Sequence, residues 1–142
     1  MIIKNLSHQD LDSIVQMQSL CFPDGWNKQM LEDGLLLGNL HGLVATIDDK
    51  LLGFITYMVN SDFAEVMDIL VSPTNRRNGV ATQLFSSFLS LIKGKTQKVS
   101  LEVRESNEQA INFYKKMGLV EVFVRKKYYQ DGENALIMEK EI

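Results

Sequence analysis

Residues 64–81 read AEVMDILVSPTNRRNGVA, and this stretch organises the interpretation of the whole chain. The apolar run from Val66 to Val71 predicts a strand buried on both faces, and Pro73 ends it because proline has no N–H for a strand ladder. From Val80 onward the apolar spacing becomes helical. A strand, a glycine-containing loop and a helix in this order direct free backbone N–H groups at one point, which is typical of a phosphate-binding site.

The loop sequence RRNGVA, residues 76–81, limits the kind of phosphate site. It lacks the Gly-Lys-Ser/Thr ending of a nucleoside triphosphate loop and the three glycines of a dinucleotide fingerprint. Asn78-Gly79 is also a common turn sequence, so a plain surface loop is an equally good interpretation of this stretch alone.

Composition and charge narrow the function classes. The chain has 142 residues, 45% hydrophobic and 23% charged, which predicts one globular domain spanning residues 1–142. A net charge of −3 disfavours a nucleic-acid partner. No apolar run is long enough for a membrane span or resembles a signal peptide. The single cysteine, Cys21, allows no internal disulfide, and we expect a cytoplasmic protein.

The apolar spacing predicts elements in the order β-α-α-β-β-β-α-β-α-β-β. The strand over Val99–Val103 alternates, with Glu102 on its polar side. Residues 106–109, SNEQ, form a capping-box pattern that predicts Ser106 as a helix N-cap. The helix after Gly79 is expected to have an apolar face of Val80, Leu84, Phe88 and Leu91. A mixed sheet with helices on both faces would bury these elements.

Three segments together resemble the GCN5-related N-acetyltransferase (GNAT) family. The first is the loop of residues 76–81, with its Arg-x-x-Gly-x-Ala pattern, and the second is residues 101–119, LEVRESN running into FYKKMGL. The third, residues 125–138, contains RKKYY and ENALIM and is similar to the ribosomal-protein alanine N-acetyltransferase (RimI-like) branch. The resemblance implies the GNAT fold, a mixed, mostly antiparallel sheet of about seven strands flanked by helices.

The resemblance also implies the reaction. Acetyl-CoA would be the co-substrate, and the acceptor would be the N-terminal α-amine of a protein, most specifically an alanine-starting ribosomal protein. An α-amine has a pKa of about 7.7–8.0, so near neutral pH it needs only a modest base, and direct attack in a ternary complex requires no nucleophilic side chain. Cys21 is therefore disfavoured as a covalent nucleophile, and two histidines without clustered cysteines do not predict a metal site.

Two residues are the predicted catalytic groups. Glu102, on the polar side of its strand, is the candidate base, directly or through a water, and the resemblance implies the same role. Tyr114 is the candidate acid for the departing thiolate. Each also has a plain structural interpretation, as a surface glutamate and as a tyrosine packed at the edge of the core.

Backbone groups are expected to make most of the coenzyme contacts. The strand end near Leu70 and Val71 would polarise the thioester carbonyl, and N–H groups at the helix start would hold the pyrophosphate. Asn107 is expected either to contact the pantetheine arm or simply to begin a helix. The full predicted coenzyme-binding set is Ile69, Leu70, Val71, Arg76, Arg77, Asn78, Gly79, Val80, Ala81, Thr82 and Asn107. The predicted acceptor-binding residues are Glu65, Tyr128 and Tyr129.

Two other functions fit the same sequence. A small-molecule amine acetyltransferase would share the fold, since fold does not determine substrate. A non-enzymatic acyl-CoA-binding module is a third possibility, and the presence of both Glu102 and Tyr114 argues against it. The sequence makes no prediction about the oligomeric state.

Overall fold

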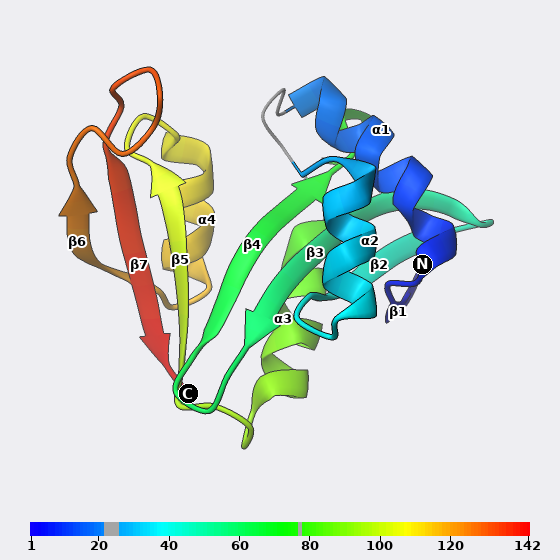
Figure 1. Cartoon of the computed structure of the whole chain (residues 1–142), viewed down its shortest axis with the longest axis horizontal. Helices are drawn as coiled ribbons and strands as arrows, with labels where there is room; N and C mark the ends of the chain where they lie inside the picture. The colour runs from blue at the N-terminus through cyan, green and yellow to red at the C-terminus, as the bar shows by residue number, and fades with distance from the viewer. Residues whose placement is uncertain (22–25, 77) are drawn as a thin grey trace. The chain divides into compact units, whose positions relative to one another are not determined.

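The computed structural model describes residues 1–21, 26–76 and 78–142, without the side chain of Cys21, and it confirms the predicted order of elements (Figure 1). Two short 3-10 helices, η1 (His8–Asp10) and η2 (Pro73–Asn75), lie between the main elements. The helices are α1 (Leu11–Cys21), α2 (Lys28–Leu36), α3 (Val80–Ile92) and α4 (Glu108–Lys116). The strands are β1 (Ile2–Asn5), β2 (His41–Ile47), β3 (Lys50–Val59), β4 (Ala64–Val71), β5 (Lys98–Arg104), β6 (Val120–Arg125) and β7 (Ala135–Glu141).

The predicted mixed seven-stranded sheet is confirmed, with the strand order β1-β2-β3-β4-β5-β7-β6. The chain divides into two compact units. Unit 1 consists of Met1–Met58 and Asp68–Leu91, and unit 2 of Val59–Met67 and Ile92–Ile142. Strand β4 therefore contributes its first half to unit 2 and its second half to unit 1.

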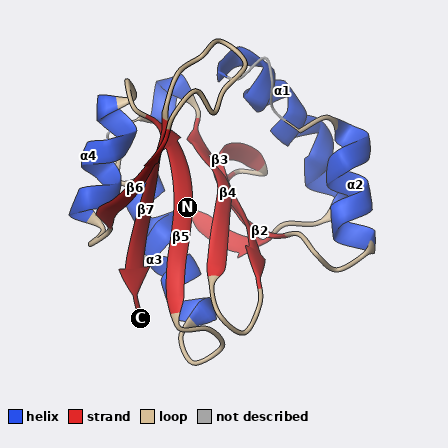
Figure 2. Ribbon diagram, turned by 60° about the vertical axis from the view of Figure 1, so that its left-hand side comes forward, coloured by secondary structure: helices blue, strands red, loops and turns tan. Residues whose placement is uncertain are grey.

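Unit 1 contains antiparallel strands with helices on both faces. β1 pairs with β2 and β2 with β3, both antiparallel, while α1 and α2 lie on one face and α3 on the other (Figure 2). Asn27 begins α2, because its side chain accepts a hydrogen bond from the N–H of Met30 at 2.9 Å. The largest fully buried side chains on β3 and α3 include Phe54, Leu84, Phe85 and Phe88.

Two expectations about burial are wrong. On α3, Leu91 is 40% exposed and Ile92 is 1% exposed, so the apolar face turns by one residue from the predicted one. In the run from Val66 to Val71, Val66 and Leu70 are buried and the other four residues are half-buried. A run of apolar residues cannot by itself distinguish a strand buried on both faces from one that is partly open.

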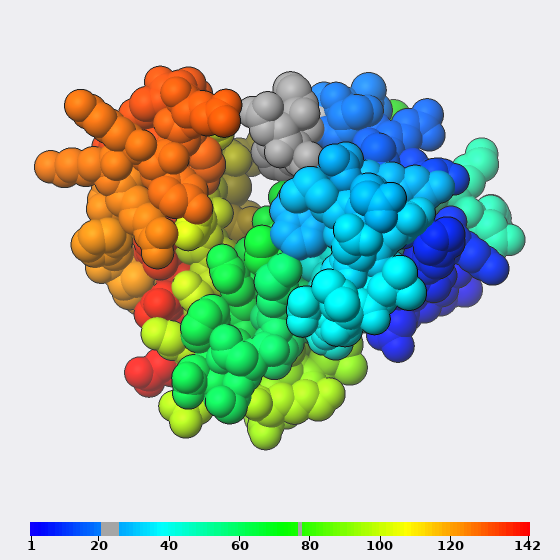
Figure 3. All heavy atoms as spheres, in the orientation of Figure 1, coloured from blue at the N-terminus to red at the C-terminus, as the bar shows by residue number. Residues whose placement is uncertain are grey.

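Unit 2 pairs the first half of β4 with β5 in parallel and β5 with β7 in antiparallel, and β6 is added beside β7. β6 is exposed along its whole length and lies at the surface in the space-filling view, coloured orange (Figure 3). The predicted capping box at α4 is wrong in its N-cap. Asn107, not Ser106, is the N-cap and accepts from the N–H of Ala110 at 3.2 Å. Ser106 is instead engaged by a loop carboxylate described below.

No helix among the described residues is long and apolar enough to cross a membrane.

Candidate active site

The second half of β4 leaves backbone groups outside the parallel register with β5. That register covers Ala64–Val66, so the three residues Ile69–Val71 lie beyond it. The N–H of Ser72 donates to the carbonyl of Leu52 at 2.8 Å, which closes the strand end against β3. Arg76 folds back over the same end, and its Nε donates to the carbonyl of Val71 at 3.3 Å. The strand end and an arginine thus lie together within unit 1.

The start of α3 has the features of an anion site. The carbonyl of Gly79 accepts from the N–H of Gln83 at 3.0 Å, so Gly79 is the N-cap, and the N–H groups of residues 80–82 have no acceptor within the helix. Gly79 has a φ of +77°, and apart from its two chain neighbours no described residue has an atom within 4 Å of the place where a Cβ would stand. Asn78 is exposed beside it. Arg77, which was also predicted to bind the coenzyme, lies outside the described residues.

Gly53 on β3 lies against the end of β4. A Cβ at Gly53 would stand 2.6 Å from the carbonyl oxygen of Leu70 and 3.2 Å from the Cα of Val71. Both are backbone atoms, so a side chain here must displace the strand end itself. The close approach explains why a glycine stands in the middle of an otherwise large-residue strand.

Gly53→Ala is expected to lower the free energy of unfolding by about 1–3 kcal/mol, because the added methyl group overpacks against backbone. It should also weaken acetyl-CoA binding, since it moves Leu70 and Val71. Urea unfolding and calorimetric titration would measure the two effects. Gly34→Ala is the matched control, because its Cβ would stand 2.8 Å from the Cβ of Leu40, away from β4. Equal acetyl-CoA affinity in the two variants would contradict the expected effect on binding.

Unit 2 gathers two carboxylates on one face of its sheet. Glu65 lies opposite Ser100 in the parallel register, and residues two apart share a face, so Glu65 and Glu102 are on the same side. Burial raises the pKa of Glu65, the charge of Glu102 raises it further, and the charge of Arg125 opposes both. Arg125 Nη1 lies 3.8 Å from Glu102 Oε1. The predicted base therefore has one arginine and a second carboxylate around it.

The two tyrosines after β6 complete this cluster. A hydrogen bond between the Tyr128 hydroxyl and Glu102 raises the pKa of Tyr128. Tyr128 packs edge-on against Tyr129 with ring centroids 5.2 Å apart, and Arg125 lies 5.5 Å from the Tyr128 ring centroid. Arg104 stacks over the Tyr129 ring at 4.0 Å. The structure thus brings together Glu65, Glu102, Tyr128 and Tyr129, and their roles in the reaction stay predictions.

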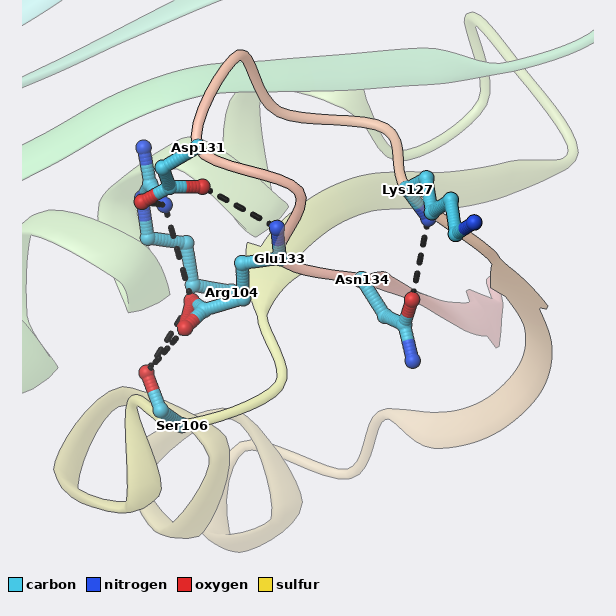
Figure 4. A network of polar contacts seen from close by, with 6 residues as sticks. All are labelled: Arg104, Ser106, Lys127, Asp131, Glu133 and Asn134. Carbon is cyan, nitrogen blue, oxygen red and sulfur yellow. Dashed lines mark hydrogen bonds and ion pairs between the residues drawn. The ribbon is translucent and has the colours of Figure 1, made fainter.

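A network of polar contacts fixes the loop that carries Tyr129 (Figure 4). Arg104 Nη1 lies 2.8 Å from Asp131 Oδ2 and 3.6 Å from Glu133 Oε1. Ser106 Oγ donates to Glu133 Oε2 at 2.7 Å. The backbone N–H of Glu133 and then the Arg104 guanidinium hold the pKa of Asp131 below its ordinary value. The Ser106 hydroxyl therefore donates its hydrogen bond to Glu133 and does not cap α4.

The remaining predicted residues have clear structural roles. Tyr114 is buried on α4, with its ring edge-on to Phe113 at 5.6 Å. Asn107 begins the helix, and its predicted contact with the pantetheine arm stays a prediction. The question of a covalent role for Cys21 lies outside the described side chains. The part of the chain that the structure describes holds no group of three or more His, Cys, Asp or Glu side chains suited to a metal ion.

Sequence reasoning missed the residues that support this site. Arg104 and Arg125 lie inside the segments that carry the resemblance, but their partners come from strands and loops far along the chain. It also missed a contact in unit 1 between Gln18 on α1 and Asp68 on β4, 3.4 Å from Nε2 to Oδ2. The sequence did contain a signal for this contact, because Asp68 is a single acidic residue within an apolar run.

Comparison with known proteins identifies the family of the chain. The sequence profile of the Acetyltransferase (GNAT) family matches residues 11–119. A protein of Bacillus subtilis (strain 168), provisionally named as an alanine N-acetyltransferase of ribosomal protein bS18, is 34% identical over 139 residues, covering 96% of this chain and 92% of the relative. An N-alpha-acetyltransferase of Sulfurisphaera tokodaii is 31% identical over 150 residues, covering 96% of this chain and 90% of the relative.

Solved structures have the same fold. Ard1 from Thermoplasma volcanium superposes with a TM-score of 0.90 at 29% identity, covering 99% of this chain and 97% of that one. The ribosomal-protein-S18-alanine N-acetyltransferase from Escherichia coli gives 0.89 at 28% identity, covering 99% and 93%. The resemblance inferred from the three sequence segments is confirmed. A family profile over most of the chain and relatives over nearly all of it show that this protein belongs to the Acetyltransferase (GNAT) family and is an acetyltransferase.

Proposed function

We propose that the protein transfers the acetyl group of acetyl-CoA to the N-terminal α-amine of a protein, and that an alanine-starting ribosomal protein is its substrate. Such a substrate would place the enzyme in the cytoplasm. The observation that carries the proposal is the cluster in unit 2, where Glu102 lies with Tyr128 and Arg125 beside a second carboxylate. The names of the relatives support the α-amine and the ribosomal protein as the class of acceptor.

Residues of unit 1 fit the coenzyme. A pyrophosphate suits the N–H groups of Val80, Ala81 and Thr82, which have no acceptor within the helix, and a glycine at position 79 allows the backbone to approach it closely. Arg76, with Arg77 next to it in sequence, adds positive charge, and Asn78 lies in the same loop. The pantetheine amides can pair with the backbone of Ile69–Val71 as an added strand would. The same backbone would polarise the thioester carbonyl.

Glu102 and Tyr114 would move the two protons of the reaction. The amine nitrogen attacks the thioester carbonyl carbon, so a C–N bond forms and the C–S bond breaks. Glu102 takes the proton that the amine loses, directly or through a water, and Tyr114 gives a proton to the departing thiolate. A thiol has a pKa of about 8.5, so the thiolate is a good leaving group and the acid contributes less than the base.

The tyrosine pair and Glu65 would contact the acceptor peptide. Tyr128 is 48% exposed, which leaves its ring available to a peptide chain. Asn107 remains a candidate contact of the pantetheine arm. These roles assign Tyr128, Tyr129 and Glu65 to specificity rather than to the chemical step.

A panel of acceptors tests the proposal. Free thiol release from acetyl-CoA would be followed with an alanine-starting ribosomal peptide, the same peptide with an acetylated N-terminus, a lysine side-chain acceptor and several small amines. The free alanine peptide is expected to give the highest kcat/KM, and the blocked peptide none. If a small amine gave a higher kcat/KM than every peptide, the acceptor would be a small-molecule amine and not a protein N-terminus. Tight acetyl-CoA binding without turnover of any acceptor would mean a binding module instead of an enzyme.

A further inference from the structure

Asp68 is a carboxylate of unit 1 for which the described residues show no cationic partner. It stands on β4 directly before Ile69–Val71 and is half-buried, so part of it is accessible. Among the described residues its one side-chain hydrogen-bond partner is Gln18 on α1, a neutral amide. Burial alone raises the pKa of Asp68, to about 6, and no charged group is among the causes. At pH 7.5 the side chain is therefore mostly ionised, and no described residue is shown to supply it with a compensating positive charge.

Gln18 donates a hydrogen bond to Asp68 while its own side-chain oxygen has no hydrogen-bond partner among the described residues. The Gln18 side chain is 2% exposed, and its Nε2 points at Asp68 Oδ2 at 3.4 Å. Its Oε1 is buried with no hydrogen-bond partner among the described residues. Turning the amide over would place Oε1 against the carboxylate, and two acceptors would then face each other. A buried unpaired acceptor is destabilising, and such groups in a native protein call for an explanation.

A cation with N–H donors is the kind of ligand whose chemistry suits Asp68. The hydrogen bond from Gln18 is long, so it leaves most of the acceptor capacity of Asp68 unused. A metal ion is a poor candidate, because no group of three suitable ligands occurs among the described residues. An ammonium group presents three donors and one positive charge. Asp68 also lies within about 10 Å of Val71 along the strand, close to the backbone proposed to hold the thioester.

We propose that Asp68 binds the acceptor amine in its ammonium form before reaction, and that Gln18 is a positioning residue that aims the carboxylate. This inference rests on the proposed function and adds the residue that recognises the charged N-terminus. Glu65, on the first half of β4, is the other carboxylate of this strand, and the charge of Arg125 already acts on it. Asp68 has no such partner among the described residues, so it is the better ammonium ligand.

Kinetics with an alanine-starting peptide test the role of Asp68. Asp68→Asn is expected to raise the peptide KM about ten- to hundredfold, the size of a lost hydrogen bond to a charged group, and to leave kcat within a few-fold. The acetyl-CoA Kd should not change. In the wild type the peptide KM should rise as pH falls through about 6, because Asp68 then loses its charge, and this rise should vanish in the variant. Asp12→Asn, on the exposed side of α1, is the matched control.

Gln18→Leu tests whether Gln18 positions the Asp68 carboxylate or only fills space in the core. It removes the donor that stabilises the ionised carboxylate, so the pH at which the peptide KM rises should move upward. A purely structural role would lower stability and leave that pH unchanged. An unaltered peptide KM in both Asp68→Asn and Gln18→Leu would overturn the proposal.

A binding experiment keeps this test independent of turnover. Alaninamide, which carries an ammonium, is expected to shift the NMR signals of the Gln18 side-chain amide in the wild type and not in Asp68→Asn. N-acetylalaninamide, which lacks the charge, should shift neither. Failure of every α-amine acceptor in the enzyme assay would refute the proposed function, whereas equal shifts with both compounds, or none, would refute the role of Asp68.

Discussion

Glu102→Gln is expected to lower kcat by about 10²- to 10⁴-fold, the usual contribution of a general base. Glutamine keeps the size of the side chain and its place beside Arg125 and Tyr128 but cannot accept the amine proton. The loss should be largest at low pH, where the α-amine, with a pKa of about 7.7–8.0, is mostly protonated. Steady-state rates with saturating acetyl-CoA and an alanine-starting peptide, measured from pH 6 to 9, would give the result.

The control for this prediction is Glu121→Gln, which removes a carboxylate from β6 of the same unit. Glu121 is 45% exposed and pairs with Lys115 at 3.2 Å, away from the tyrosine pair. Its rate should equal that of the wild type at every pH. If Glu102→Gln kept both the wild-type rate and the wild-type pH profile, the base would have to be another group, and Glu65 would be the next candidate. Loss of activity without a change in pH profile would point to a structural role for Glu102.

Local patterns predicted the elements well because they depend on neighbours in the chain. The alternation over Val99–Val103 appears in β5 as buried Val99, Leu101 and Val103 with Glu102 between them. The errors came from choices between adjacent candidates. Either Ser106 or Asn107 can cap a helix, and the hydrogen bond from Ser106 to Glu133, which decides between them, joins residues 27 positions apart.

The candidate site was predictable only in part. Resemblance placed Glu102, Tyr128 and Tyr129 in one site, and the structure brings them together. Their supports could not be inferred, because the partners of Arg104 and Arg125 depend on how β5, β6 and the loop before β7 fold. Gln18 and Asp68 are 50 positions apart in the sequence. From the apolar pattern alone, Gln18 is an ordinary helix residue and Asp68 a polar interruption of a strand, so nothing in the pattern links them.

Asp68→Asn is expected to stabilise the protein at neutral pH, even as it impairs acceptor binding. Burial raises the pKa of Asp68 from 3.8 to about 6. Well below pH 4 the group is protonated in both the folded and the unfolded chain. Between pH 4 and 6 the unfolded chain ionises first, so the folded state loses relative stability, and above pH 7 the loss is complete at about 3 kcal/mol. Asparagine does not ionise and should not show this loss.

Urea unfolding of the wild type and Asp68→Asn from pH 4 to 8 would measure this difference. The free energy of unfolding of the variant minus that of the wild type should grow by up to about 3 kcal/mol across this range, with most of the change between pH 4 and 7. The exposed Asp12→Asn variant should run parallel to the wild type. A constant difference between Asp68→Asn and the wild type would mean that Asp68 ionises as it does in the unfolded chain. In that case the Asp68 carboxylate would be well solvated. The unpartnered Oε1 of Gln18 would then no longer be explained by a buried charge beside it. The expected gain in stability and loss of acceptor affinity have one cause: the Asp68 charge has no cationic partner among the described residues, and the proposed amine would supply one.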